Sequence, residues 1–130
     1  MPIIIDQLDV YSDARGRVFE PLEADSFAAQ RNSHVVINMP GAVRGNHYHD
    51  TGLETAIVMG PALIRVREDG VARDIEVPPE KVYRFSFPPE VSHAIKNTGK
   101  RPNVIVVFYT FDYDPDNPDS ISDILIDPEI

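Results

Sequence analysis

The sequence consists of short apolar runs separated by turn-forming residues, and this alternation limits the chain to folds built from short strands. Twelve prolines and seven glycines lie between the runs rather than in one block. That distribution favours an all-β fold with many turns over a disordered chain. The runs predicted to be strands are Ile3–Leu8, Arg17–Leu22, Val35–Met39, Val43–His49, Thr55–Met59, Leu63–Arg67, Ala72–Val77, Val82–Phe87, His93–Lys96 and Val104–Phe111. Short strands at this regular spacing predict a sandwich or a barrel closed on itself.

Local signals between the runs agree with this assignment. Glu68-Asp69-Gly70 lies between LIRVR and VARDIEV and predicts a hairpin turn, with a glycine available for positive φ. Helical periodicity occurs only weakly, around Glu23–Gln30, where an acidic first turn and alanines allow a short helix. The length of 130 residues suits a single buried core.

The composition changes after Asp112, and we expect one domain over residues 1–112 followed by a tail over residues 113–130. The tail, YDPDNPDSISDILIDPEI, is acidic and proline-rich except for an apolar cluster at Ile124, Leu125 and Ile126. This cluster predicts that the tail is anchored, either on its own domain or on a partner subunit.

Charge and composition exclude several classes of function. The formal net charge of −9 argues against a general nucleic-acid binder, which needs a basic face. It leaves room for one phosphate-bearing small molecule held by a few arginines. The chain has no cysteine, so we expect neither a disulfide framework nor a thiolate ligand. The start, MPIIIDQLD, is unlike a signal peptide, and the longest apolar run, Val104–Tyr109, is far shorter than the ~20 residues that span a bilayer. We therefore expect a cytoplasmic protein that does not enter a membrane.

Three of the four histidines, together with one glutamate, form the pattern with the most chemical content. His47 and His49 are two residues apart on a predicted strand and should share a face. Glu54 begins the next strand after a turn-like stretch, and His93 opens another strand after a double-proline turn. Imidazoles with a carboxylate suit a divalent metal such as zinc, iron, nickel or manganese. The alternative is a site of the same shape without metal, in which a histidine transfers protons. His34 lies outside the pattern and is predicted to be an ordinary surface or boundary histidine.

The stretches that hold these residues resemble the two motifs of the cupin superfamily. GAVRGNHYHDTGLETAIVMG, residues 41–60, resembles the first motif, and PPEVSHAIKN, residues 88–97, resembles the second. The second departs from the usual pattern at Glu90, where a glycine is common. The resemblance implies a double-stranded β-helix, the jelly-roll barrel of cupins, in agreement with the number of predicted strands.

A narrower resemblance covers nearly the whole chain. GNHYH, ALIRVR, SHAIKNTG and FDYDPDNPD resemble the C-terminal cupin domain of capsular polysaccharide nucleotide-sugar epimerase/reductases. That family implies zinc at the histidine site and inversion of a carbon beside the ketone of a nucleotide-linked 4-keto-6-deoxy sugar. DARGR, residues 13–17, is similar to the opening of the deoxysugar ketoisomerase and epimerase cupins, which generally work without a catalytic metal.

We therefore expect a metal-dependent cupin that acts on nucleotide-activated 4-keto-6-deoxy sugars by enolisation, as an epimerase or a ketoisomerase. The expected ligands are His47, His49, Glu54 and His93, and zinc is the first choice, with iron, manganese and nickel as alternatives. A metal acting as a Lewis acid would stabilise the negative charge of the enolate. Two other functions remain open: a non-catalytic sugar-binding or sensing cupin, and a small-molecule cupin dioxygenase.

Three residues are candidates for substrate binding, although the sequence does not identify the general base. Arg44 precedes the first motif and Arg65 lies in LIRVR, and arginines bind pyrophosphate through bidentate contacts. Both also suit a solvated surface. Tyr83 shares a strand face with Phe85 and Phe87, so it either reaches the cavity or packs in the core. A homodimer is the expected assembly, because an exposed sheet edge favours pairing with a second copy.

Overall fold

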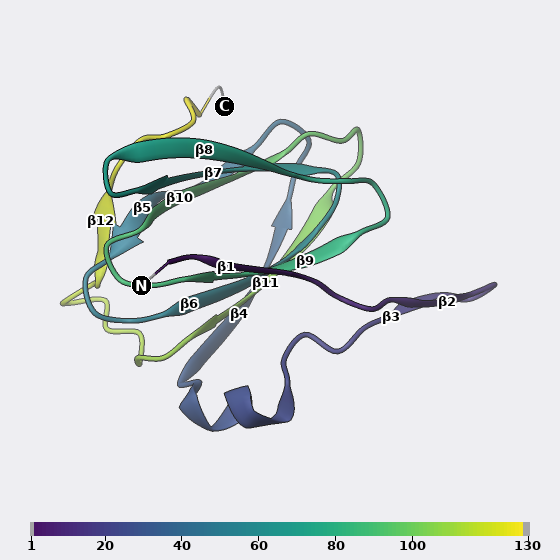
Figure 1. The fold of residues 1–130 in the computed structure, drawn as a ribbon, viewed down its shortest axis with the longest axis horizontal. Helices are drawn as coiled ribbons and strands as arrows, with labels where there is room; N and C mark the ends of the chain where they lie inside the picture. The colour runs from purple at the N-terminus through teal and green to yellow at the C-terminus, as the bar shows by residue number, and fades with distance from the viewer. Residues whose placement is uncertain (1, 129–130) are drawn as a thin grey trace.

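The computed structural model describes residues 2–128 and is built almost entirely of antiparallel strands (Figure 1). One five-stranded sheet has the order β1 (Ile4–Gln7), β9 (Val82–Phe87), β6 (Glu54–Met59), β11 (Asn103–Tyr109) and β4 (Asn32–Asn38). The other has the order β12 (Ser120–Ser122), β5 (Val43–His49), β10 (Ser92–Asn97), β7 (Ala62–Glu68) and β8 (Val71–Val77). The predicted all-β architecture is confirmed.

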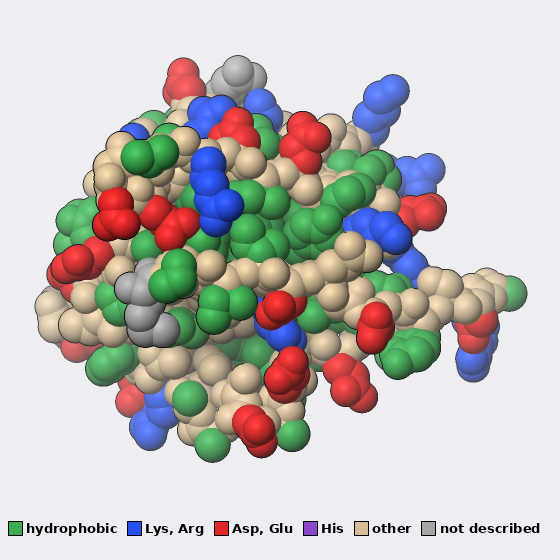
Figure 2. Space-filling view, in the orientation of Figure 1, with side chains coloured by type: hydrophobic (Ala, Val, Ile, Leu, Met, Phe, Trp, Pro, Cys, Tyr) green, Lys and Arg blue, Asp and Glu red, His purple; other side chains and the backbone are tan. Residues whose placement is uncertain are grey.

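The hydrophobic core lies between the two sheets. Alternate residues of the strands point inward, among them Ile64 and Val66 of β7, Phe85 and Phe87 of β9, and Ile105 of β11, and each is at most 1% exposed. Burying a side chain of this size contributes about 1.5–3 kcal/mol relative to leaving it in water. Hydrophobic side chains are visible in the centre of the face in Figure 2, between the edge strands β8 and β1.

A small hairpin projects from the body of the domain (Figure 1). It consists of β2 (Tyr11–Asp13) and β3 (Gly16–Val18), which form a separate two-stranded sheet. The carboxylate of Asp13 closes the turn by accepting hydrogen bonds from the backbone and the guanidinium of Arg15. The stretch DARGR therefore forms the tip of an exposed arm.

Each predicted strand has a counterpart, but the structure changes some boundaries. The run Arg17–Leu22 contributes only to β3, because the chain then leaves the sheet. The weak helical signal corresponds to a 3-10 helix, η1 (Ala24–Ala29). Asp69 and Gly70 both have positive φ, 49° and 78°, so the predicted hairpin turn between β7 and β8 is confirmed.

The C-terminal segment lies along the second sheet. β12 pairs with β5, and Ile126 is buried. Three residues of sequence SIS carry too little signal to predict a strand, and β12 forms because β5 offers a free edge. The division of the chain at residue 112 stays a prediction. Among residues 2–128, no helix is long and apolar enough to cross a membrane.

Candidate active site

The strand that carries the histidine pair has a bulge just before it. His93 of β10 lies opposite His47 of β5, whereas the next residue, Ala94, lies opposite Gly45, so β5 holds one extra residue here. Gly45 and Asn46 both have positive φ, 89° and 56°. A Cβ atom at Gly45 would lie 2.7 Å from the carbonyl oxygen of His93, so the close approach of the two strands requires a glycine.

The structure brings the four predicted ligands together. One ligand atom from each of His47, His49, Glu54 and His93 lies within 4.8 Å of the others. The ring centroids of His47 are 4.9 Å from those of both His49 and His93. Because β5 and β10 belong to one sheet and β6 to the other, the cluster joins the two sheets at one end of the barrel. Metal binding itself stays a prediction.

His93 is held in one orientation by two contacts. Its Nδ1 lies 3.1 Å from the carbonyl oxygen of Val91, and its ring stacks on Phe87 with centroids 4.0 Å apart. When Nδ1–H donates to Val91, the neutral ring presents the lone pair of Nε2 to the cluster. Nε2 lies 2.9 Å from Oε2 of Glu54, yet it makes no hydrogen bond. Two acceptors at this distance repel each other unless a cation, either a proton or a metal ion, lies between them.

The protonation states of the cluster suit a metal ion. Burial alone would raise the pKa of Glu54, but the charge of His93 and the close contacts with the His93 and His49 rings outweigh it and hold the pKa well below its usual range. Burial, with a smaller contribution from His93, lowers the pKa of His47 to about 4. Near neutral pH the carboxylate is therefore ionised and the His47 imidazole neutral, the forms that coordinate a divalent metal. Buried Nδ1 of His49 and Nε2 of His93 have no hydrogen-bond partner among residues 2–128, so the donor set fits a metal.

A cavity of about 220 Å³ opens beside the cluster. It is lined by Asn32, His34, His47, His49, Glu54, Val107, Tyr109, Asp112, Tyr113, Asp114, Asn117, Pro118, Asp119 and Ser120. Its outer wall is thus the first part of the C-terminal segment. His34, which the sequence pattern leaves aside, faces this cavity from β4, so three of the four histidines line it and the fourth, His93, completes the cluster behind it.

Tyr109 is a further side chain of this cavity that the sequence patterns do not single out. Its ring lies 4.6 Å from that of His49, centroid to centroid, and its hydroxyl donates to the carboxylate of Asp119. The backbone N–H of Gly52 donates to the same hydroxyl over 3.0 Å. Burial, together with the hydrogen bond and charge of Asp119, raises the pKa of Tyr109 well above its usual value. The phenol is therefore protonated near neutral pH. Alternation along β11, in which Ile105 also points inward, is the signal that could have identified it.

The three predicted substrate-binding residues lie away from this cavity. Arg44 is exposed, with its Nε 3.3 Å from Oδ1 of Asn38. Arg65 pairs with Asp74 of the neighbouring strand, Nε to Oδ1 over 2.7 Å. Tyr83 packs beside the core residue Phe85 with ring centroids 6.2 Å apart. None of the three lines the histidine cavity.

The rim of the cavity is acidic, and one arginine reaches it. In the described part of the chain, the lining contains Glu54, Asp112, Asp114 and Asp119 but no lysine or arginine. Arg31 is paired with Asp112 over 3.4 Å, and both side chains are largely exposed. A phosphate group bound at the rim could therefore replace Asp112 as the partner of the Arg31 guanidinium.

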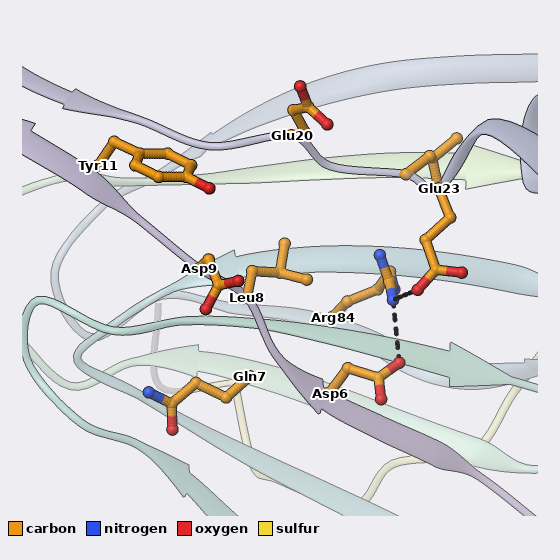
Figure 3. A pocket seen from close by; sticks show the side chains of 9 residues that line it. Asp6, Gln7, Leu8, Asp9, Tyr11, Glu20, Glu23 and Arg84 are labelled. Carbon is orange, nitrogen blue, oxygen red and sulfur yellow. Dashed lines mark hydrogen bonds and ion pairs between the residues drawn. The ribbon is translucent and has the colours of Figure 1, made fainter.

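A larger cavity, of about 360 Å³, lies elsewhere, along β1 and β9 (Figure 3). Acidic side chains surround Arg84 there, and its guanidinium lies 3.1 Å from Asp6 and 3.4 Å from Glu23. No histidine lines it, and its one basic side chain is already paired with carboxylates. Size alone therefore does not identify the candidate site. The imidazoles and the Glu54 carboxylate favour the smaller cavity, because these are the groups that can bind a metal or transfer protons.

The sequence matches the family described as polysaccharide biosynthesis C-terminal domain over residues 11–121. The chain belongs to this family. Glu90, at the position where the second cupin motif commonly has glycine, adopts a φ of 71°, which explains the usual preference for glycine there. No curated protein matches the sequence of this family member significantly.

Solved structures similar to this polysaccharide biosynthesis C-terminal domain include sugar-modifying cupins. The capsular polysaccharide assembling protein CapF from Staphylococcus aureus has 26% identity and a TM-score of 0.68 over 91% of this chain. The match covers 33% of CapF, so this chain spans about a third of that protein's length.

Two further structures show the same fold. QdtA, a sugar 3,4-ketoisomerase from Thermoanaerobacterium thermosaccharolyticum solved with TDP, has 19% identity and a TM-score of 0.70, with 92% of this chain and 86% of QdtA covered. ChmJ, a 3′-monoepimerase from Streptomyces bikiniensis solved with dTDP-quinovose, has 20% identity and a TM-score of 0.75, with 92% and 68% covered. The predicted cupin fold is confirmed.

Proposed function

We propose that this domain is an isomerase or epimerase that moves a proton next to the ketone of a nucleotide-linked 4-keto-6-deoxy sugar. The observation that carries the proposal is the cavity itself. It is lined by three imidazoles and the carboxylate of Glu54, beside the protonated phenol of Tyr109. The names of two structures of the same fold, a 3,4-ketoisomerase and a 3′-monoepimerase, support this class of reaction.

The proposed reaction begins with loss of a hydrogen from the carbon beside the ketone. The electrons of that C–H bond shift toward the ketone oxygen and give an enolate. His47, His49, Glu54 and His93 would hold a divalent metal, with zinc as the first choice and iron, manganese or nickel as alternatives. Such a metal supplies Lewis-acid stabilisation of the developing charge, worth several kcal/mol.

Two side chains of the cavity are suited to the proton transfers. His34 lies outside the four-residue cluster, so its imidazole is free of the proposed metal and can accept the proton at a ring nitrogen. Tyr109 carries a proton on its hydroxyl near neutral pH and can donate it. Return of a proton to the opposite face of the same carbon is epimerisation. Ketoisomerisation delivers the proton to the former ketone carbon instead, while the hydroxyl on the first carbon gives up its proton to become the new ketone and the old ketone oxygen gains a proton to become a hydroxyl.

The nucleotide would lie toward the rim. Arg31 is the basic side chain that contacts a residue of the lining, and its long contacts with Asp112 leave it able to bind a diphosphate instead. In this proposal Arg31 replaces Arg44 and Arg65 as the phosphate partner.

Deuterium exchange tests the proposal. The protein, loaded with zinc, is incubated in D₂O with 4-keto-6-deoxyglucose linked to TDP, the ligand of one ketoisomerase structure of this fold, and with the UDP form. We expect deuterium in the sugar beside the ketone, detected by mass spectrometry and placed by NMR. Tyr109→Phe should slow the exchange by ~10²-fold or more. Tyr83→Phe removes the same hydroxyl from a residue outside the cavity and should leave the rate unchanged.

The outcomes separate the competing functions. Saturable binding of the sugar nucleotide with no exchange in any metal form would contradict the proposal and favour a sugar-binding module. Tightly bound iron with oxygen consumption would favour a dioxygenase.

A further inference from the structure

The segment from Asp119 to Ile126 is bound to β5 and β10, the two strands that carry the histidines of the cluster. β12 pairs along β5, with Ser120 opposite His49 and Ser122 opposite His47. This contact accounts for the yellow strand beside β5 in Figure 1. The same segment continues past β12 and also contacts β10, at Ser92.

Beyond the pairing of β12, Asn46 makes a cluster of hydrogen bonds between this segment and β5. Its side-chain Nδ2 donates to the carbonyl oxygen of Ile126 over 2.9 Å. Its Oδ1 accepts from the backbone N–H groups of Leu125 and Ile126, over 2.9 and 3.1 Å. Its own carbonyl oxygen accepts from the N–H of Asp123 over 2.8 Å. One residue thus makes four hydrogen bonds to three residues of the segment, Asp123, Leu125 and Ile126.

The contact with β10 runs through the side chain of Asp123. Its carboxylate accepts from the hydroxyl of Ser92 and from the guanidinium of Arg67, each over 2.5 Å. Ser92 directly precedes His93 on β10 and is 4% exposed. The segment therefore links the residue before His93 to the residue before His47.

This link lies where the β5–β10 ladder is irregular. The register shifts between His93 and Ala94, at the bulge formed by Gly45 and Asn46. A bulge leaves backbone groups unpaired and bends its strand, and small changes there redirect the side chains that follow. Asn46 is only 8% exposed and its φ is 56°, in the left-handed region that asparagine tolerates better than most residues.

We propose that Asn46 is a positioning residue of the histidine cluster: by binding the backbone of Leu125 and Ile126 it locks the bulge and sets the direction of His47 and His49. This inference rests on the proposed metal site. Asn46 does not line the cavity, so it acts on the ligands and not on the substrate. Loss of a residue that orients metal ligands typically lowers metal affinity 10–100-fold.

The test compares glycine and aspartate variants of the full chain. Asn46→Gly keeps the left-handed backbone and removes the three side-chain hydrogen bonds. Asn46→Asp keeps an acceptor for the two N–H groups and loses the donor to Ile126. Asn103→Gly is the matched control, because Asn103 is also 8% exposed and donates to a backbone carbonyl, that of Met59, at the start of β11.

The measurements are Zn²⁺ affinity by competition with a chelator, and the visible absorption spectrum of the Co²⁺-loaded protein, which reports ligand geometry. We expect Asn46→Gly to lower Zn²⁺ affinity 10–100-fold and to change the Co²⁺ spectrum, with Asn46→Asp in between. Asn103→Gly should lower the melting temperature while both metal measurements stay at wild-type values.

The failures of the two proposals are distinguishable. A wild-type protein that binds neither Zn²⁺ nor Co²⁺ would overturn the metal site and this inference with it. Wild-type binding together with wild-type affinity and spectrum in Asn46→Gly would overturn this inference alone. If the glycine variant does not fold, the same result in Asn46→Asp overturns it.

Discussion

Replacing Gly52 by alanine is expected to displace Tyr109 while the histidine cluster stays in place. A Cβ atom at this position would lie 2.1 Å from Cζ and 2.2 Å from the hydroxyl oxygen of Tyr109. Ordinary contact begins at 3.4 Å, so the phenol must move by about the difference between 3.4 and 2.1 Å, that is about 1.3 Å. The backbone of Gly52 is outside the left-handed region, so alanine adds no backbone strain of its own.

The displacement should reduce the rate of catalysis far more than it reduces stability. Misplacement of a catalytic group by about 1 Å costs roughly 10²-fold in rate. The movement also removes the hydrogen bond from Gly52 N–H and disturbs the contact with Asp119. Overpacking of this kind costs about 1–3 kcal/mol of unfolding free energy. We therefore expect a folded Gly52→Ala variant with full metal content and ~10²-fold slower deuterium exchange.

The assay is the exchange reaction with the keto-sugar nucleotide, combined with elemental analysis of bound metal. Gly52→Ala is measured alone, and again in a Tyr109→Phe background. If the alanine acts by moving the phenol, it should have little further effect once the hydroxyl is gone. An unchanged exchange rate in Gly52→Ala would refute the role of Tyr109, and a full 10²-fold loss in the double variant would refute the link between the two residues.

Three further predictions concern the cluster and the assembly. His49→Ala or His93→Ala should remove most of the bound metal and leave the β-sheet circular dichroism intact; unchanged metal content in both would contradict the ligand assignment. In metal-free protein, His47 has a folded-state pKa of about 4 against an ordinary value of 6.5, so protons bind the unfolded chain preferentially. The melting temperature should therefore be constant above pH 6.5 and fall as the pH drops toward 4, and a flat profile would show that the imidazole is not buried in its neutral form. Light scattering should detect a dimer, and lysine at Val35 or Ile37, which are 63% and 65% exposed on the edge strand β4, tests whether this apolar surface holds the two copies together.

Much of the fold follows from local patterns in the sequence. The bounds of β5 and β9 agree with their apolar runs, because alternation and flanking prolines or glycines are local properties of the chain. The grouping of His47, His49, Glu54 and His93 also follows from the sequence. Strand alternation places the first two on one face, Glu54 and His93 begin two other predicted strands, and the cupin resemblance implies the same four residues.

Only the tertiary structure decided which other side chains line the cavity or support the strands that carry its histidines. The Tyr109 hydroxyl contacts both Asp119 and the backbone N–H of Gly52. Asn46 binds residues about 80 positions further along the chain. Both contacts form because the two sheets bring distant segments together. Arg44 and Arg65 have the chemistry of phosphate ligands, yet the strands direct them to other partners. The physical reason is that periodicity determines the face of a strand on which a residue lies. Whether that face opens on a cavity depends on bulges, twist and long-range packing, which no local pattern specifies.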